Sequence, residues 1–597
     1  MSAITVALCQ FRPTKGSPTA NLDRIEQLFR SFAAAPVPPD VICLPETILT
    51  GYFLEGGVRE HALSADTLFA ELSLRHTRAG APPVEVCLGF YERWNDRLHN
   101  SAIWIALGGS DAGVRHVHRK IFLPTYGVFD EERFVEAGSE VRAFPTRFGR
   151  AAMLVCEDAW HSITSTIAAV DGAQLIAVLA ASPARGIAPD EVQPGQPGSL
   201  ARWERLARDI AGEHGVFVTL TQLVGFEGGK GFPGGSVLAG PGGEILTRAP
   251  LFEDAAVQHT IELEEIARER AASPLLADLE QRLPHLVEGL DRARKASRSV
   301  QPESFPAANT TPVRAEGTRA EAPPPVSRLA IDAELTRRWL VEFLRDEVTR
   351  RRGFTKVIIG LSGGVDSAVV ATLAAQALGP ENVIAVRMPY RTSSPDSLTH
   401  ARLVVESLGI SERTVDITAA VDGYAAASGT MPTPARLGNV MARTRMLALF
   451  DLSAACAALP LGTGNKSERL LGYFTWHADD APPVNPIGDL FKTQVWALAR
   501  HLGVPSAIVE KPASADLVQG QTDESDFGVA YARADAILDL LLQGHSVGAL
   551  YAAGFNAVEV DLVRRRLDTT HWKRKLPSVA MLSQTAIGEY YLRPVDY

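Results

Sequence analysis

The sequence predicts an α/β protein built from two large domains, on three observations. The chain has 597 residues, too many for one ordinary hydrophobic core. Short apolar runs alternate with helical patterns in both halves, which is typical of α/β folds. Between the halves, proline, alanine and small polar residues dominate without an apolar period, which indicates a linker. We therefore expect a first domain over 1–268, a helical extension and proline-rich linker over 269–327, and a second domain over 328–597.

The first half contains a succession of strand-like apolar runs. In order they are "ITVALCQF", "DVICLPE", "VEVCLGFYE", "SAIWIAL", "AAMLVCEDAW", "AQLIAVLAAS", "GVFVTLTQLVG" and "GGSVLAGPGG". Beyond them, "LLADLEQRLPHLVEGLDRARKA" has helical spacing that is interrupted at Pro284. In the second half, "KVIIGLSGG", "NVIAVRMP" and "TVDIT" alternate with helical patterns over 366–378 and 396–408. This alternation predicts a parallel sheet with crossover helices.

The charge and the cysteine pattern exclude several classes of protein. The chain has 59 basic and 69 acidic residues, a net charge of −10, and no basic run typical of nucleic-acid or membrane binding. We expect no signal peptide, and no apolar run approaches the roughly 20 residues of a membrane span. The five cysteines are widely spaced without a C-x-x-C pair, so neither a disulfide framework nor a structural zinc site is expected. We expect a soluble, cytoplasmic protein without nucleic-acid or membrane partners.

Three apolar runs of the first half each adjoin a reactive side chain. Glu46 closes "DVICLPE", Lys120 precedes "IFLP", and Cys156 closes "AAMLVC". Taken singly, such a cysteine is usually structural, and such a glutamate or lysine is usually solvated. Together they could attack an amide, because a glutamate in a dehydrated pocket can deprotonate a thiol and an ammonium group can stabilise the oxyanion.

These residues and their flanking sequences resemble the nitrilase (carbon–nitrogen hydrolase) superfamily over about residues 3–265. More narrowly, "HRKIFLPTYGVFDE" is similar to the glutaminase domain of glutamine-dependent NAD⁺ synthetases. The resemblance implies an αββα sandwich, with Glu46 as general base, Lys120 as oxyanion stabiliser and Cys156 as nucleophile. Gln222 stands where the family leads us to expect asparagine. The implied glutamine-binding residues are Tyr126, Glu157 and, within "ASPARG", Ser182.

The stretch "GLSGGVDS" over 360–367 allows several interpretations. It satisfies the G-x-S-x-G pattern of serine hydrolases, but no HGGG-type oxyanion loop accompanies it. A Walker A loop would require Gly-Lys-Ser/Thr, which never appears, and a purely structural glycine turn stays open. The favoured interpretation is a pyrophosphate-binding loop, in which backbone N–H groups converge on phosphate at a helix N-terminus. Asp366 would repel that phosphate unless Mg²⁺ bridges the two.

The SGGxDS pattern is shared by several ATP pyrophosphatases, including NAD⁺, GMP, asparagine and argininosuccinate synthetases and tRNA-thiolating enzymes. Together with the stretches "NVMARTRM", "LPLGTGNKSERLLGYFT", "GDLFKTQVWALARHLGVP", "EKPASADLVQGQTDESDFGVAY" and "THWKRKLP", it resembles NAD⁺ synthetases over 328–597, which implies a doubly wound parallel-sheet ATP pyrophosphatase domain. The implied ATP-binding residues are Gly360, Ser362, Gly363, Gly364, Asp366, Ser367, Thr463, Lys492 and Ser514, with Asp516 in the same closing loop. The implied Mg²⁺ ligands are Asp366 and Glu468. For deamido-NAD⁺ the resemblance implies Arg443, Asp479, Lys573 and Arg574, with Arg445 as a further phosphate or subunit-interface contact.

The resemblance implies a glutamine-dependent NAD⁺ synthetase reaction. The nicotinate carboxylate of deamido-NAD⁺ attacks ATP, and ammonia from glutamine, carried through an internal tunnel, then displaces AMP from the NAD-adenylate. The resemblance also implies Mg²⁺ as cofactor, ATP as co-substrate, and a homo-oligomer, either a dimer of synthetase domains or a larger assembly up to an octamer.

One stretch departs from the family pattern. After "GYFT" the sequence continues "WHADDAPPVNPIG", and Ala478, Pro482 and Pro483 stiffen a loop that is expected near the nicotinate ring. An amidotransferase acting on nicotinate mononucleotide or another adenylated carboxylate is therefore the alternative enzyme. An inactive glutamine or nucleotide sensor is the alternative from another class, although the intact Glu46, Lys120, Cys156, Asp366 and Glu468 argue against it.

Overall fold

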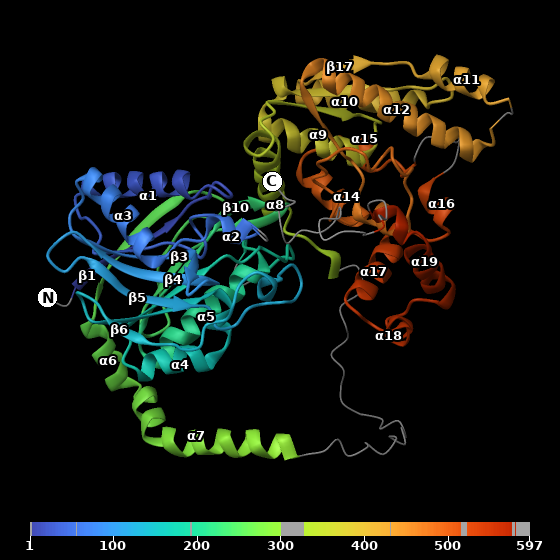
Figure 1. Ribbon diagram of the computed structural model, residues 1–597. Helices are drawn as coiled ribbons and strands as arrows, with labels where there is room; N and C mark the ends of the chain where they lie inside the picture. The colour runs from blue at the N-terminus through green and yellow to red at the C-terminus, as the bar shows by residue number, and fades with distance from the viewer. Residues whose placement is uncertain are drawn as a thin grey trace. The chain divides into compact units, whose positions relative to one another are not determined.

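The computed structural model describes residues 3–54, 57–190, 194–299, 328–429, 432–514, 522–575 and 580. Contacts divide them into two compact units (Figure 1). The first unit holds the described residues up to 185 and those of 199–299. The second holds 328–580 together with the segment 186–198, whose Ile187 carbonyl accepts a hydrogen bond from the Asp332 amide at 2.7 Å. Asp516 lies outside the described residues.

The first unit contains two six-stranded sheets and a two-stranded hairpin. The first sheet has the order β14-β1-β2-β3-β4-β5, and the second has the order β13-β12-β9-β8-β7-β6. The strands of the first sheet are β1 (Ala3–Gln10), β2 (Val41–Cys43), β3 (Val84–Trp94), β4 (Arg97–Leu107), β5 (Gly113–Arg119) and β14 (Ala255–Glu262). Those of the second are β6 (Ala143–Pro145), β7 (Arg150–Val155), β8 (Leu175–Ala180), β9 (Phe217–Gln222), β12 (Val237–Ala239) and β13 (Ile245–Arg248). The hairpin pairs β10 (Val224–Glu227) with β11 (Lys230–Pro233).

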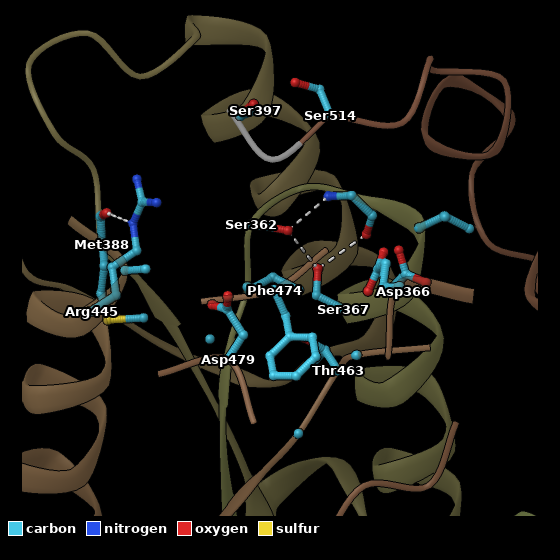
Figure 2. Close-up of a pocket in the computed structure, with 18 of the residues that line it drawn as sticks. Ser362, Asp366, Ser367, Met388, Ser397, Arg445, Thr463, Phe474, Asp479 and Ser514 are labelled. Carbon is cyan, nitrogen blue, oxygen red and sulfur yellow. Dashed lines mark hydrogen bonds between the residues drawn. The ribbon is translucent and has the colours of Figure 1, made fainter. Parts of the chain in front are cut away.

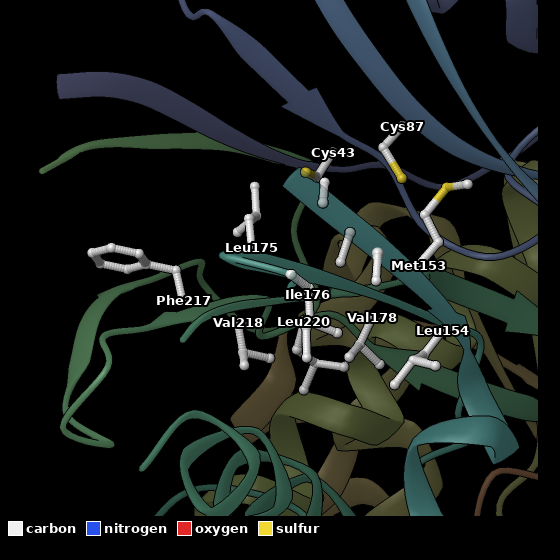
Figure 3. Packing of buried hydrophobic residues seen from close by; sticks show 14 of the residues in the cluster. Cys43, Cys87, Met153, Leu154, Leu175, Ile176, Val178, Phe217, Val218 and Leu220 are labelled. Atoms are coloured by element: carbon white, nitrogen blue, oxygen red, sulfur yellow. The ribbon is translucent and has the colours of Figure 1, made fainter. Parts of the chain in front are cut away.

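Helices cover the outer face of each sheet. Leu22, Ile25 and Phe29 of α1 (Pro18–Ala33) and Leu68 and Leu72 of α3 (Ala65–Ala79) pack on the first sheet. The second sheet is covered by α4 (Ser162–Val170) and α5 (Gly198–His214). The two sheets face each other across a shared apolar core, in which Cys43 and Cys87 lie opposite side chains of β7, β8 and β9 (Figure 3). The predicted αββα sandwich is confirmed.

A short helix, α2 (Val58–His61), precedes α3 within the sandwich. The helical segment after the sandwich is longer than the sequence indicated, and it begins with α6 (Glu264–Ala272), which follows β14. Next, α7 (Leu275–Ser299) continues through Pro284, so the expected interruption there does not break the helix. None of the described helices in either unit is long and apolar enough to cross a membrane.

The second unit is built on a four-stranded, fully parallel sheet of order β17-β16-β15-β18. Its strands are β15 (Lys356–Gly360), β16 (Val383–Arg387), β17 (Ser411–Thr414) and β18 (Ala458–Leu461). Alternate side chains of β15 enter opposite layers, because Val357 and Ile359 pack with α9 (Val365–Leu378) while Ile358 packs with Leu449 of α12 (Pro434–Cys456). With helices on both faces, this is the predicted doubly wound sheet.

The remaining helices complete the second unit. The helices α8 (Ala333–Leu344) and α14 (Lys492–His501) lie on the same layer as α9. A separate apolar cluster gathers α13 (Lys466–Leu471), α17 (Tyr531–Leu542), α18 (Val547–Ala552) and α19 (Ala557–Thr569). The others are α10 (Pro395–Leu408), α11 (Thr418–Ala427), α15 (Ser506–Val509) and α16 (Asp523–Phe527).

The order of the parallel strands locates a binding site. After β15 the chain adds β16 and then β17 on one side of β15. The strand β18, which comes later in the sequence, pairs with the other side of β15. Open α/β sheets bind ligands at such a switch point, just outside the carboxyl ends of the strands. In this unit the switch point lies between the ends of β15 and β18, at Gly360 and Leu461.

Candidate functional site

Cys156 lies at a sharp turn immediately after β7. Its backbone has φ +48°, a left-handed conformation that is uncommon for a residue with a side chain. A short 3₁₀ helix over Cys156–Trp160 begins there. Non-glycine residues in this conformation concentrate at functional sites, where the surrounding structure holds the strain. The thiol is buried.

Lys120 is fully buried between two carboxylates. Its Nζ lies 2.9 Å from Oε1 of Glu46 and 2.7 Å from Oε1 of Glu131. Asn100 donates to the same two carboxylate oxygens at 2.8 and 3.2 Å, and the Tyr52 hydroxyl donates to Glu131. The structure thus brings Glu46 and Lys120 together as predicted, and it adds Glu131 and Asn100, which the sequence reasoning missed.

The other oxygen of Glu46 accepts the backbone N–H of Ala181 at 2.7 Å, which connects the end of β8 to this cluster.

Burial raises the pKa of Cys156 well above its ordinary value. The Glu46 carboxylate raises this pKa further, and the Lys120 ammonium lowers it. Cys156 is therefore a protonated thiol at rest and requires a base. Burial works against the charge on Lys120, but Glu131 and Glu46 outweigh it and raise the pKa of Lys120 well above its ordinary value. Lys120 thus remains an ammonium group, the form that stabilises an oxyanion.

Asp158 links the segment that carries Lys120, just after β5, to the turn that carries Cys156. One of its oxygens accepts the backbone N–H groups of Ile121 and Phe122 at 2.9 and 3.0 Å. The other lies 2.8 Å from Nε2 of His118 and accepts the backbone N–H of Val155 at 3.1 Å. Asp158 is fully buried, so these bonds are shielded from water.

The predicted glutamine-binding residues include the sequence neighbours of Cys156 and of Ala181, whose amide bonds Glu46. The Tyr126 hydroxyl lies 3.0 and 2.9 Å from the two carboxylate oxygens of Glu157. Partial burial and the Glu157 carboxylate raise the pKa of Tyr126 to about 12. Ser182 accepts a hydrogen bond from Nε1 of Trp203 at 2.8 Å. Gln222 ends β9 with a buried side chain whose amide atoms have no hydrogen-bond partner among the described residues. The roles of these residues toward glutamine stay predictions.

The stretch 360–367 forms the predicted strand, loop and helix in the second unit. Gly360 ends β15, Gly364 is the N-cap of α9, and the loop between them passes under α10. Gly363 has φ +78°, and a Cβ on it would lie only 2.2 Å from the carbonyl oxygen of Ser397. Only glycine fits there. The Ser362 and Ser367 hydroxyls are 3.2 Å apart.

A cavity of about 330 Å³ opens over this loop (Figure 2). Arg445 and Met388 lie at one side of it, and Nε of Arg445 donates to the Met388 carbonyl at 3.1 Å. Several lining residues were not singled out from the sequence, because no pattern distinguishes them: Met388, Ser397, Phe474, Asn485, Lys511 and Asp523. Of the predicted residues, Gly360, Ser362, Gly364, Asp366, Ser367, Arg445, Thr463, Glu468, Asp479, Lys492 and Ser514 line it.

Two carboxylates and a lysine form the charged side of the cavity. The Lys492 ammonium pairs with Asp366 and lies 3.5 Å from Oε1 of Glu468. Nδ2 of Asn465 donates to Asp366 at 3.0 Å. Burial and the Asp366 carboxylate raise the pKa of Glu468 to about 8. The ammonium group therefore lies beside two acids that repel each other.

These acids fit Mg²⁺, which binds one or two protein carboxylates and completes its shell with water and substrate phosphates. No larger group of His, Cys, Asp and Glu suited to a metal occurs in the described part of the chain. Asp366 and Glu468 would hold the ion, and the ion would neutralise ATP phosphates beside the loop. The Lys492 side chain, predicted to contact phosphate, neutralises the acids in this structure.

The predicted deamido-NAD⁺ residues are distributed more widely. Asp479 lines the cavity and accepts the Thr475 amide at 2.7 Å. Arg443 does not line the cavity and donates to the Trp476 carbonyl at 3.2 Å. Lys573 donates to the carbonyls of Gly472 and Phe474, and Arg574 donates to carbonyls at the end of α13. Their contact with a dinucleotide stays a prediction.

Comparison with known proteins identifies a family for each unit. The carbon–nitrogen hydrolase family model matches residues 5–271, and the NAD synthase model matches residues 336–577. An NH(3)-dependent NAD(+) synthetase from Chlorobaculum parvum (strain DSM 263 / NCIMB 8327) is 48% identical over 263 residues, which are 44% of this chain and 94% of that protein. One from Trichlorobacter lovleyi (strain ATCC BAA-1151 / DSM 17278 / SZ) is 49% identical over 275 residues, 46% of this chain and 99% of that protein.

The whole chain also has a structural counterpart. A glutamine-dependent NAD+ synthetase from Acinetobacter baumannii, solved with adenosine diphosphate, superposes with a TM-score of 0.66 at 24% identity. The superposition covers 97% of this chain and 95% of that one, so the two share a two-domain fold. Because this chain spans nearly the full length of synthetases that are 48% and 49% identical to its matching region, it belongs to the NAD⁺ synthetase family and carries a carbon–nitrogen hydrolase domain ahead of the synthetase domain.

Proposed function

We propose that this protein is a ligase that amidates deamido-NAD⁺ to NAD⁺, using ATP and ammonia that it takes from glutamine. The observation that carries the proposal is the presence of two complete sets of reactive groups in one chain. A buried thiol, carboxylate and ammonium set occupies the hydrolase unit. A glycine loop at a sheet switch point, with two acids beside it, occupies the synthetase unit.

In the hydrolase unit, the Cys156 thiol attacks the side-chain amide carbon of glutamine. Glu46 accepts the thiol proton, since the raised pKa of Cys156 means that no thiolate exists beforehand. Lys120 stabilises the oxyanion. The tetrahedral intermediate expels ammonia with that proton and leaves a thioester, which water then hydrolyses to glutamate and free thiol.

In the synthetase unit, the nicotinate carboxylate attacks the α-phosphorus of ATP. Pyrophosphate leaves toward the backbone N–H groups of the loop over 360–367. Asp366 and Glu468 would hold Mg²⁺, which would offset the negative charge of the phosphates. Ammonia then attacks the adenylated carboxyl carbon and AMP leaves. A passage closed to bulk water would keep ammonia from being protonated before it reacts. We include such a tunnel, and a cytoplasmic location, in the proposal.

The proposal includes self-association through α12. Leu447 of this helix is 66% exposed and Phe450 is 37% exposed, although the helix also packs on the sheet through Leu449. Tyr424 of the neighbouring α11 is 57% exposed. Large apolar side chains exposed on one helix are a feature of protein interfaces, so we propose that a second copy covers this face of α12.

A product assay tests the main proposal. Purified protein receives ATP, Mg²⁺, glutamine and either deamido-NAD⁺ or nicotinate mononucleotide, and NAD⁺, NMN and AMP are measured directly. We expect NAD⁺ and AMP in equal amounts with deamido-NAD⁺. Clear preference for nicotinate mononucleotide would contradict the acceptor assignment and would identify the 476–483 loop, whose Ala478, Asp479, Asp480 and Pro482 line the cavity, as the cause. No AMP with either acceptor would contradict the ligase activity.

A further inference from the structure

Asp535 is a buried acid of the synthetase unit to which the proposed reaction gives no role. It belongs to α17, where Ala534, Ile537 and Leu538 around it are buried apolar residues. The Asp535 side chain is fully buried, and it does not line the cavity over the loop of 360–367. A buried carboxylate is costly unless hydrogen bonds compensate its charge, so the partners of Asp535 indicate what it does.

The partners of Asp535 lie at the starts of two other helices. Its Oδ2 accepts the backbone N–H of Thr493 at 3.0 Å and the Thr493 hydroxyl at 2.9 Å. Its Oδ1 accepts the Ser467 hydroxyl, whose oxygen in turn accepts the backbone N–H of Lys492 at 2.9 Å. Ser467 lies in the first turn of α13, and Lys492 and Thr493 are the first two residues of α14. One carboxylate therefore joins three helices.

The start of α14 depends on this carboxylate for its cap. The first N–H groups of a helix have no acceptor within the helix, and Phe491, which precedes α14, has no polar side chain to offer them. Ser467 and Asp535 accept the first two of these groups. A negative charge is also favourable at a helix N-terminus. From a different helix, Asp535 thus fills the role that an N-cap side chain normally has.

The two helix starts carry charged groups of the cavity. Glu468 directly follows Ser467, and Lys492 directly precedes Thr493. The Lys492 ammonium pairs with Asp366 and lies 3.5 Å from Oε1 of Glu468. A movement of α13 relative to α14 would therefore change the distance between groups that Mg²⁺ and the ATP phosphates must contact together.

The same face of α17 holds another residue of the cavity. Tyr531 lies one turn before Asp535, and its hydroxyl donates to Asp523, which lines the cavity, at 3.0 Å. The Tyr531 ring packs edge-on against Trp496 of α14, with ring centroids 5.8 Å apart. Residues four apart lie on one face of a helix, so the face of α17 that carries Tyr531 and Asp535 lies against α14.

We propose that Asp535 is a positioning residue of the synthetase site, an inference that rests on the proposed synthetase reaction. Its carboxylate fixes the starts of α13 and α14 relative to each other. It thereby keeps Glu468 and Lys492 at the separation that joint binding of Mg²⁺ and ATP requires. Because Asp535 lies outside the lining of the cavity, it acts on the nucleotide through Ser467 and Thr493.

ATP binding separates this role from a contribution to folding alone. The test measures the Kd of ATP by calorimetry for wild type and Asp535→Asn, each with and without Mg²⁺. We expect Mg²⁺ to tighten ATP binding in the wild type, and we expect this gain to be roughly tenfold smaller in Asp535→Asn. The reason is that hydrogen bonds to a neutral amide are weaker than those to a carboxylate. The Kd of deamido-NAD⁺ should be unchanged. The amide keeps the volume of the side chain, so Asp535→Asn should fold even if Asp535→Ala does not.

A matched variant controls for stability. Asp346→Asn changes another buried aspartate of the same unit, which pairs with Arg350 and does not line the cavity. It should lower the midpoint of thermal unfolding but leave the gain from Mg²⁺ unchanged. An unchanged gain in Asp535→Asn, or the same loss of gain in Asp346→Asn, would overturn the assignment of Asp535. An equally large loss of deamido-NAD⁺ affinity in Asp535→Asn would also overturn it. A wild-type protein that forms no AMP would instead contradict the proposed ligase activity, and ATP binding would still test Asp535.

Discussion

Lys120 is buried beside two carboxylates, Glu46 and Glu131, and this arrangement gives the two glutamates different roles. A buried ammonium between Glu46 and Glu131 gives the group of three a net negative charge. That charge helps to raise the pKa of Cys156 and keeps its thiol protonated. Glu46 can then accept the thiol proton, while Glu131 keeps Lys120 charged and in place. The two glutamates share one lysine but have different roles.

Glu131→Gln tests this division of roles. The amide keeps the shape of the side chain but removes the second negative charge beside Lys120. We expect glutamine hydrolysis to fall by about two orders of magnitude or more, because Lys120 is then less well held for the oxyanion. Ammonium-driven NAD⁺ synthesis should be retained. The exposed neighbour provides a matched control, and Glu132→Gln should have no effect on either assay. Wild-type glutaminase activity in Glu131→Gln would show that Glu46 alone supports Lys120.

The contrast between Glu46 and Glu131 shows what sequence can reveal about a site. Glu46, Lys120 and Cys156 each adjoin an apolar run, so their position relative to a sheet is visible in the pattern. Glu131 follows Asp130 and precedes Glu132, and nothing in "DEERF" distinguishes the buried acid from its exposed neighbours. Its partner Lys120 is eleven residues away and meets it only through the fold.

At the scale of the element, the glycine loop of 360–367 depends on a close approach between two segments. Gly363 passes beneath the start of α10, where the Ser397 carbonyl occupies the space that a Cβ would need. Gly364 has φ −94°, and a Cβ on it would lie 3.3 Å from Oγ of Ser362, a mobile side-chain atom. The two adjacent glycines are therefore not equivalent.

Gly363→Ala should abolish ATP-dependent AMP formation, because the loop must move away from α10 and its N–H groups then no longer converge. Backbone strain of this kind costs about 1–3 kcal/mol before the clash is counted. Gly364→Ala should retain measurable synthesis with a weaker apparent affinity for ATP. The measurement is AMP release at several ATP concentrations, with glutamine hydrolysis as the check on folding. An equal loss of AMP formation in both variants would mean that the close approach of Gly363 to Ser397 does not determine the conformation of the loop.

Element type was largely visible in the sequence, because strands buried on both faces leave continuous apolar runs such as "KVIIG". The extent of helix α7 was harder to predict. Proline removes one backbone donor, and the sequence pattern suggested a break at Pro284, but the helix continues on both sides of it. The order of the strands was not visible either, since β14 joins β1 at a separation of about 250 residues.

At the scale of the whole molecule, association between copies is open to a direct test. Leu447 is largely exposed on α12, so Leu447→Asp should leave the folded chain intact and add a charge to the proposed interface. We expect a smaller molar mass by light scattering than for wild type at the same concentration. Asp561→Ala changes an exposed charged position on α19 instead and should leave the molar mass unchanged. An unchanged mass for Leu447→Asp would place the interface elsewhere.

The two units should also be separable by chemistry. Cys156→Ala removes the nucleophile, and loss of a covalent nucleophile typically costs many orders of magnitude, so glutamine-driven NAD⁺ formation should fall to background. The loop, Asp366 and Glu468 belong to the other unit and stay intact, so ammonium salts at alkaline pH, which supply free NH₃, should still drive synthesis.

Asp366→Asn should show the reverse, with no AMP from either nitrogen source but with a Cys156 that still forms the glutamyl thioester. The experiment measures NAD⁺, AMP and glutamate for wild type and both variants, each with glutamine or ammonium. Glutamine use by Cys156→Ala would contradict the nucleophile assignment, because none of the other cysteines adjoins the Glu46 and Lys120 pair. A folded Cys156→Ala protein that is inactive with ammonium as well would contradict the separation into two sites linked by ammonia.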